Sequence, residues 1–176
     1  MSKLPDSQTL ASLVSNVTRT MCGVSFVPGD AMERGESICR QMVMIPLRGD
    51  PNIVVVVSSD ARGSRALGAA FFGKKPSEVT EPMIDDAIAE LLNMVAAQIS
   101  TALGSTHQLG FPARTTLPEI AVGRGLRLDD AALLHSEGAI DLGLWILEGP
   151  AAATDKQPAS APGGFRSLLR KIGVNS

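Results

Sequence analysis

Residues 84–99 constrain the fold more than any other stretch, because their apolar side chains recur with the period of an α-helix. At about 100° per residue, one arc of such a helix gathers Ile84, Ile88, Leu91, Leu92, Val95 and Ile99. A narrow arc roughly opposite gathers Asp86, Glu90, Asn93 and Ala97. We therefore expect a long helix, running to about Leu103, with one face packed in a core and a separate polar face in solvent.

Two further helices are expected before the long one. Leucines and valines at helical spacing predict a helix over residues 10–21, which Gly23 would close. A second pattern predicts a helix over residues 61–72, which stops at Gly73. Thr80 stands where its side chain can cap the long helix.

Segments rich in β-branched residues, separated by glycine and proline turns, alternate with these helices. They predict strands at residues 24–27, 37–46, 52–58, 117–122, 131–136 and 140–147. The second and third would form a hairpin, and the last would be apolar on both faces. The fold class is therefore α+β, a mostly antiparallel sheet of about six strands packed by three helices.

The composition divides the chain into one domain and an extension. Residues 1–148 carry the periodic patterns and form the expected domain. Residues 149–164, dominated by Ala, Pro, Gly, Ser and Thr, are typical of a flexible linker. Residues 165–176 alternate apolar and basic side chains, which predicts a short basic amphipathic tail.

Charge and residue usage exclude several classes of function. A net charge of -2, 3% aromatic residues and no Tyr disfavour a nucleic-acid partner. The longest purely apolar run, residues 53–57, is far too short to span a bilayer, and the first residues lack a signal-peptide core. Two cysteines without a CxxC pattern agree with a cytoplasmic protein. His107 and His135 lack ligand-spaced companions, so we expect surface or capping roles for them and no metal site.

Glu90 and Asn93 are the best candidates for chemistry. A carboxylate offers a charge, and a carboxamide offers both a donor and an acceptor, so the pair can hold a lysine and a water in a partner's active site. Neither side chain acts as a nucleophile here, so the role would be one of positioning. The plain alternative is a solvated helix face, which is polar by default.

Four segments follow one another at characteristic spacing along the expected elements: Met21-Cys22-Gly23, Ala69-Ala70-Phe71-Phe72-Gly73, residues 87–96 with the Glu-x-x-Asn pair, and residues 112–120 with their prolines. In these segments and in the order of its elements, the chain resembles the CheX family of chemotaxis phosphatases, a group related to the CheC and FliY proteins. The resemblance covers about residues 8–148. The resemblance implies a two-layer sandwich, and a single Glu-x-x-Asn helix is the CheX pattern, whereas CheC proteins commonly have two.

The resemblance also implies a function, a partner and a set of site residues. The partner would be a phosphorylated CheY-like response regulator, whose aspartyl phosphate is hydrolysed. Glu90 would contact the regulator's lysine, and Asn93 would orient the attacking water. The regulator would supply Mg²⁺, so the chain itself needs no cofactor.

Further residues on the same helix are expected to touch this partner. Asp86 lies in the polar arc, Met94 flanks it, and Ala97 is small enough to allow close approach, although relatives often carry glycine at its position. The family also implies a homodimer formed through sheet edges. Two alternatives stay open: a CheX-like module that binds a receiver domain without hydrolysis, and a helix face that serves only as a dimer surface.

Overall fold

A single antiparallel sheet of seven strands forms the framework of the protein. The computed structural model describes residues 4–29, 41–104, 106–116, 131–137 and 140–148. The strands are β1 (Phe26–Pro28), β2 (Gln41–Arg48), β3 (Ile53–Ser59), β4 (Gln108–Leu109), β5 (Ala113–Thr115), β6 (Ala132–Ser136) and β7 (Asp141–Glu148). Their order across the sheet is β1-β6-β7-β3-β2-β4, and β5 also pairs with β2. Strands β2 and β3 form the predicted hairpin.

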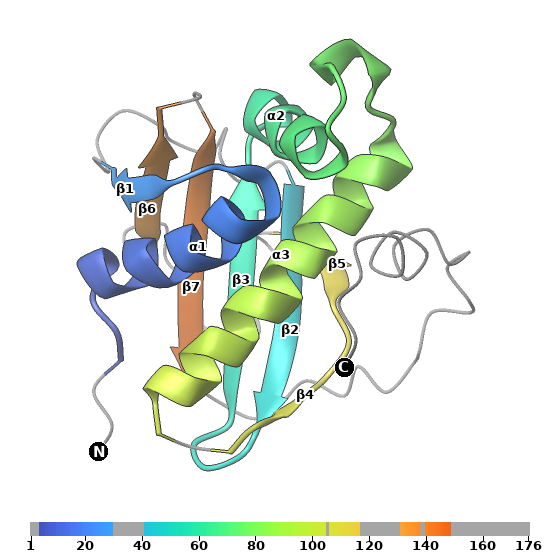
Figure 1. Ribbon diagram of the computed structural model, residues 1–176. Coiled ribbons are helices and arrows are strands. Elements are labelled where there is room, and N and C mark those ends of the chain that lie inside the picture. The colour runs from blue at the N-terminus through green and yellow to red at the C-terminus, as the bar shows by residue number, and fades with distance from the viewer. Residues whose placement is uncertain (1–3, 30–40, 105, 117–130, 138–139, 149–176) are drawn as a thin grey trace, which may run out of the picture.

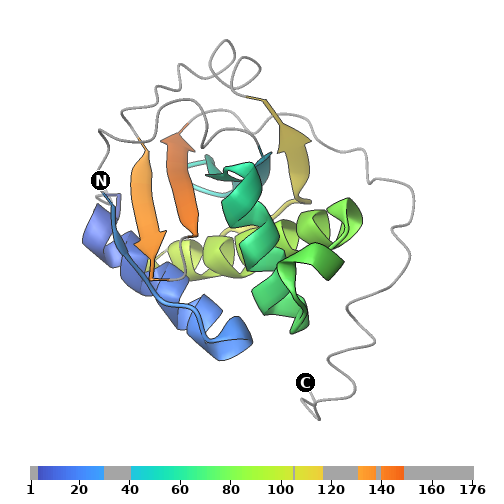
Figure 2. The same ribbon diagram turned by 90° about the horizontal axis from the view of Figure 1, so that it is seen from above.

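Three helices cover one face of this sheet, as Figures 1 and 2 show from two directions. They are α1 (Ser7–Cys22), α2 (Ala61–Phe72) and α3 (Glu81–Ala102), with a short 3₁₀ turn, η3 (Pro76–Glu78), before α3. Helix α3 runs diagonally over β2 and β3, beside α1 and below α2 in the view of Figure 1. The arrangement confirms the expected α+β fold of three helices against an antiparallel sheet.

The helix ends follow the predicted caps with one exception. Gly23 and Gly73 adopt left-handed backbone conformations, with φ of 73° and 60°, and close α1 and α2. Asp60 caps α2 by accepting a hydrogen bond from the backbone N–H of Gly63. Thr80 stands immediately before α3, at the predicted N-cap position, but its side chain makes no capping hydrogen bond, so the predicted capping role is wrong.

The main core lies between the helices and the sheet. The six predicted core residues of α3 are each at most 2% exposed. They pack with the inward side chains of β2, β3 and β7, including Ile45, Val55 and Leu144. Burial of each such side chain stabilises the fold by about 1.5–3 kcal/mol. The predicted amphipathic face of α3 is therefore the centre of the fold.

The other face of the sheet carries a second, smaller apolar cluster. Met42, Val54, Val56 and Trp145 make up this cluster. Register explains it, because Val56 of β3 lies between Met44 of β2 and Trp145 of β7. Alternation along β7 sends Leu144 to the main core and Trp145 to the second cluster. Strand β7 is thus apolar on both faces, as predicted.

Several strand boundaries differ from the prediction. Strand β1 begins two residues later than expected and ends at Pro28, and β2 extends to Arg48. The edge strands β4 and β5 were not predicted, because two and three residues are too few to show a period. The strand predicted at residues 117–122, the first part of that predicted at 37–46, the linker and the tail all lie outside the described residues.

Candidate functional site

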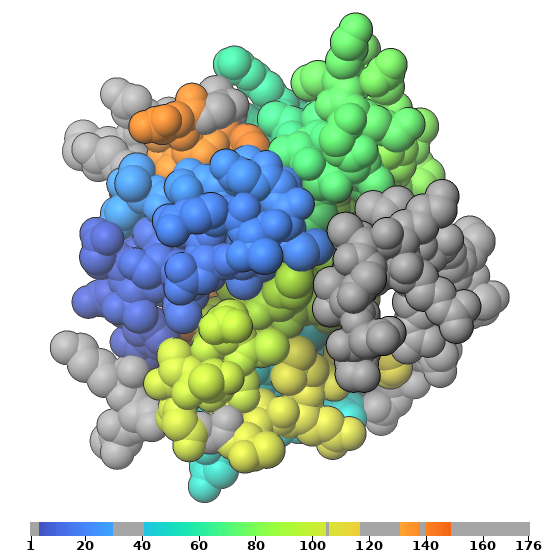
Figure 3. Space-filling model, viewed as in Figure 1, coloured from blue at the N-terminus to red at the C-terminus, as the bar shows by residue number. Residues whose placement is uncertain are grey.

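The outward face of α3 brings the predicted site residues together. Asp86 and Ala97 are exposed, and Glu90, Asn93 and Met94 are partly exposed. At a spacing of three residues, the side chains of Glu90 and Asn93 start from Cβ atoms about 5–6 Å apart. Figure 3 shows that the lower half of α3 reaches the surface between α1, in blue, and the yellow segment that follows α3. The side chains predicted to act together therefore share one accessible strip.

Glu90 and Asn93 are accessible but held on a rigid element. Helix α3 packs against α1, α2, β2 and β3. Its buried side chains are spread over the length of the helix and hold it against these elements. Among the described residues, the side chains of Glu90 and Asn93 have no hydrogen-bond or ion-pair partner. A carboxylate and a carboxamide are thus presented to a visiting molecule from a scaffold that limits their motion.

Met94 differs from the rest of the strip. Its side chain is half-buried and packs against the main core, as does that of Met83. Only the exposed part of the Met94 side chain can therefore contact a partner. Its position still marks the border between the exposed strip and the side of α3 that packs against the core.

The two acidic residues near the start of the strip have different surroundings. The carboxylate of Asp85 pairs with the Arg114 guanidinium of β5. Within the described part of the chain, the Asp86 carboxylate has no such partner. Partial desolvation of its carboxyl, followed by repulsion from neighbouring Asp85, raises the pKa of Asp86 above its ordinary value. One turn before Glu90, the strip therefore carries a carboxylate whose charge is not compensated.

Buried His107 links the C-terminal end of α3 to the turn between β2 and β3 through hydrogen bonds. The Ser100 hydroxyl lies 3.0 Å from His107 Nδ1, and His107 Nε2 lies 3.1 Å from the carbonyl oxygen of Pro51. A carbonyl only accepts, so Nε2 donates to Pro51 and Nδ1 accepts from Ser100. The backbone N–H of His107 donates to the same Ser100 oxygen.

The expected surface role of His107 is therefore wrong, since the residue is only 7% exposed. No sequence pattern indicated its partners, which lie on α3 and in the turn between β2 and β3. His135 is half-exposed and pairs with Asp141 at 2.7 Å. Among the described residues, no group of three or more His, Cys, Asp or Glu side chains is placed to hold a metal ion.

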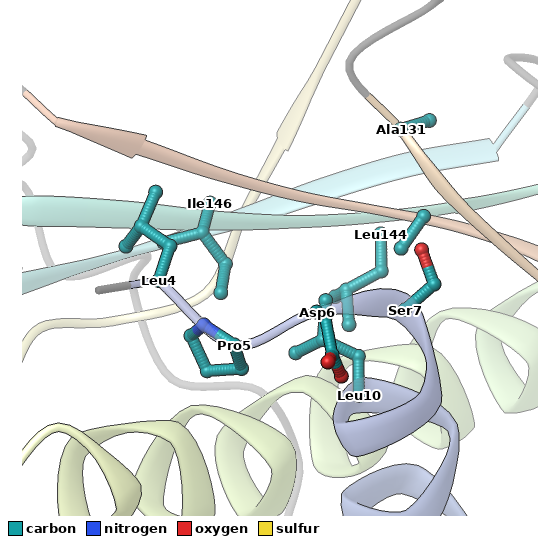
Figure 4. Close-up of a pocket in the computed structure, with 9 residues that line it drawn as sticks. Leu4, Pro5, Asp6, Ser7, Leu10, Ala131, Leu144 and Ile146 are labelled. Atoms are coloured by element: carbon teal, nitrogen blue, oxygen red, sulfur yellow. The ribbon is translucent and has the colours of Figure 1, made fainter.

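A pocket of about 320 Å³ opens elsewhere on the protein, where the chain enters α1 beside β6 and β7. Figure 4 shows Leu4, Leu10, Leu144 and Ile146 around it, together with Asp6 at the first turn of α1. The Asp6 carboxylate accepts from the backbone N–H of Thr9 and caps the helix. None of the predicted site residues lines this pocket, so the strip on α3 is a separate, open surface.

Comparison with known proteins identifies the family. The family model described as "Chemotaxis phosphatase CheX" matches residues 42–136, which is more than half of the 176 residues. The chain belongs to the CheX family. The matched region contains all of α3 and the edge strands beside it. No curated protein sequence matches the chain.

Solved structures share the CheX fold at low sequence identity. The chemotaxis protein CheX from Vibrio vulnificus is 15% identical, with a TM-score of 0.58 over 85% of this chain and all of that one. The CheX from Desulfovibrio desulfuricans is 16% identical, with a TM-score of 0.54 over 80% of this chain and 96% of that one. A CheX of Borrelia burgdorferi was solved in complex with CheY, BeF3 and Mg. It is 16% identical, with a TM-score of 0.56 over 83% of this chain and 100% of that one.

The described helices give no sign of a membrane-spanning segment. Within the part of the chain that the structure describes, none of them combines the length and the apolar character needed to cross a bilayer.

Proposed function

We propose that this protein hydrolyses the aspartyl phosphate of a CheY-like response regulator. The observation that carries the proposal is the position of Glu90 and Asn93, side by side on the outward face of a rigid helix in a CheX-family domain. The Borrelia relative, seen in a complex with CheY, supports a receiver domain as the partner. The arrangement suits a helper that completes an active site belonging to another molecule.

The proposed chemistry needs little from this chain beyond positioning. Phosphoryl transfer passes through a loose transition state, so that orientation and charge stabilisation supply most of the catalysis. The Asn93 carboxamide would accept from and donate to the attacking water, in line with the phosphorus. The Glu90 carboxylate would pair with the regulator's lysine and fix the register of the two proteins. The regulator would supply Mg²⁺ and the phosphoaspartate.

The remaining strip residues have supporting roles in this proposal. Asp86 and Met94 would touch the regulator on either side of the Glu-x-x-Asn pair. Ala97, exposed one turn after Asn93, would let the regulator's backbone approach closely because its side chain is a single methyl group. A homodimer formed through sheet edges would leave this face of α3 open.

Loss of phosphate from the regulator tests the proposal directly. Each CheY-like regulator encoded by the same genome is phosphorylated with acetyl phosphate, and its decay is followed with and without this protein. We expect acceleration for at least one regulator, and a loss of about a hundredfold in Asn93→Ala. Gln98→Ala is the matched control, because it removes another exposed carboxamide from the same helix. Absence of acceleration for every regulator would contradict the proposal.

A non-catalytic binding module is the second candidate, because binding requires only the exposed strip. The same measurements separate the two functions. A module predicts that the protein binds the beryllofluoride-treated regulator yet leaves the phosphate lifetime unchanged. A strip that serves only as a dimer surface predicts instead that Glu90→Ala alters self-association and not regulator binding.

A further inference from the structure

The segment from His107 to Arg114, which follows α3, interacts with that helix at both of its ends. At one end His107 is bonded to Ser100, and at the other Arg114 is paired with Asp85. From Asp85 to Ser100 the helix advances about 22 Å at 1.5 Å per residue. From His107 to Arg114 an extended chain advances about 23 Å at 3.3 Å per residue. The segment therefore runs antiparallel to α3 at matched length, as the yellow chain beside α3 in Figure 1 shows.

This match sets Phe111 level with the proposed catalytic pair along the axis of α3. Phe111 lies slightly beyond the middle of the segment, which corresponds to residues 90–93 on the helix. On a helical projection at 100° per residue, Asp85 and Ser100 mark the side of α3 that faces the segment. Asn93 projects about 50° from that side and Glu90 about 110° from it. Asn93 is therefore the member of the pair that projects closer to the segment that carries Phe111.

A β-bulge interrupts the sheet edge where Phe111 lies. Leu109 pairs with Leu47, and Ala113 pairs with Met44. Two residues of β2 therefore face three residues of the edge, namely Gly110, Phe111 and Pro112, and the extra residue makes the bulge. The Gly110 N–H donates to the Pro46 carbonyl at 2.8 Å, and a Cβ on Gly110 would lie 2.6 Å from Pro46 Cγ. Only glycine fits there, so the bulge has a defined geometry.

The bulge presents an exposed aromatic ring. Phe111 is 54% exposed and Leu109 is 37% exposed, and the third exposed large apolar residue among those described is Val27, at the opposite edge of the sheet. Large aromatic side chains of this kind supply much of the binding energy in protein interfaces. Pairing of a second strand along this edge is hindered by the bulge and by Pro112, which lacks an N–H. A partner that reaches Phe111 therefore packs against the ring and does not add a strand to the sheet.

We propose that Phe111 is a contact residue for the response regulator, buried when the regulator docks on Glu90 and Asn93. This inference rests on the proposed function. The regulator would present an apolar patch to the ring, next to the phosphorylation site that Asn93 reaches. Phe111 would contribute to affinity and leave the chemical step to the pair on α3.

Steady-state kinetics with the regulator that this protein dephosphorylates test the inference. In Phe111→Ala we expect KM for the phosphorylated regulator to rise about tenfold, with kcat within a factor of two. Phe111→Leu should recover part of the loss, because it restores an apolar contact. Val27→Ala, which removes an exposed apolar side chain from the far edge, should leave both constants unchanged. Thermal unfolding of each variant checks that the fold is intact.

The outcomes separate this inference from the function on which it rests. If Asn93→Ala abolishes the acceleration while Phe111→Ala keeps the original KM, the contact is wrong and the phosphatase stands. If Phe111→Ala lowers kcat and leaves KM unchanged, Phe111 acts on the chemical step and the proposed contact role is overturned. If the wild-type protein accelerates no regulator, both proposals fall together.

Discussion

The two faces of α3 differ in what holds each side chain in place. On the inner face, Leu91 and its neighbours are fixed by the packing of α1, α2 and the sheet. On the outer face, Glu90 and Asn93 have no partner among the described residues. The inner face therefore sets the stability of the domain, and the outer face is free to serve another molecule. Substitutions on the two faces should separate stability from activity.

The largest effect on stability is expected on the inner face. Leu91→Ala removes a fully buried side chain and leaves a cavity, so it should lower the free energy of unfolding by about 2–5 kcal/mol. Urea denaturation measures this loss. Gln98→Ala, on the exposed side of the same helix, should change it by no more than about 0.5 kcal/mol. Similar losses in both variants would contradict the assignment of faces.

Asn93→Ala should produce the opposite result, with activity lost and stability kept. The expected loss of about a hundredfold in dephosphorylation rate corresponds to about 2.7 kcal/mol of transition-state stabilisation. Alanine has a higher helix propensity than asparagine, so the free energy of unfolding should stay constant or rise slightly. A fall in stability as large as that of Leu91→Ala would show that Asn93 belongs to the core.

A smaller effect on stability is expected where Ser100 of α3 is hydrogen-bonded to His107. Ser100→Ala leaves the ring nitrogen and the backbone N–H of His107 without their buried partner, which should cost about 1–3 kcal/mol. Thr101→Ala is the matched control, because that hydroxyl is exposed and bonds only within its own helix. Equal stability of the two variants in urea would show that the hydrogen bonds between Ser100 and His107 do not stabilise the fold.

The smallest effect concerns the two neighbouring carboxylates. The raised pKa of Asp86 means that folding favours its protonated form. Its contribution to stability is thus full below about pH 3.8 and is lost as the pH rises through the raised pKa. Asp86→Asn should therefore stabilise the protein at pH 7, by up to about 0.5 kcal/mol, and have no effect at pH 3.

Asp85→Asn provides the comparison for this prediction. It weakens the exposed pair with Arg114 and should lower stability at pH 7 by less than about 1 kcal/mol. Thermal unfolding at the two pH values measures both variants. A destabilising Asp86→Asn at neutral pH would contradict the sign predicted for it.

The sequence predicted those parts of the molecule whose pattern repeats over several turns or along a whole strand. The apolar stripe of α3 and the continuous apolar run of β3 are of this kind, and both were placed correctly. The outward position of Glu90 and Asn93 followed from the same period, but their proposed roles came only from the family resemblance. Periodicity reports which side chains are buried and carries no information about a partner.

The edge segment could not be predicted in the same way. Strands β4 and β5 are too short to show alternation, and the bulge at Gly110 shifts the register between them. His107 was misjudged because its partners, Ser100 and Pro51, meet it only in the folded protein. Such features depend on contacts between segments far apart in the chain.

The position of Trp145 gives the protein a selective optical signal. The chain has one Trp and no Tyr, so its tryptophan fluorescence comes from a single indole. That indole lies in the second apolar cluster, on the face of the sheet turned away from α3. Fluorescence therefore reports one layer, whereas far-UV circular dichroism is dominated by the helices of the other. Coincident melting curves from the two would show that both layers unfold as one cooperative unit.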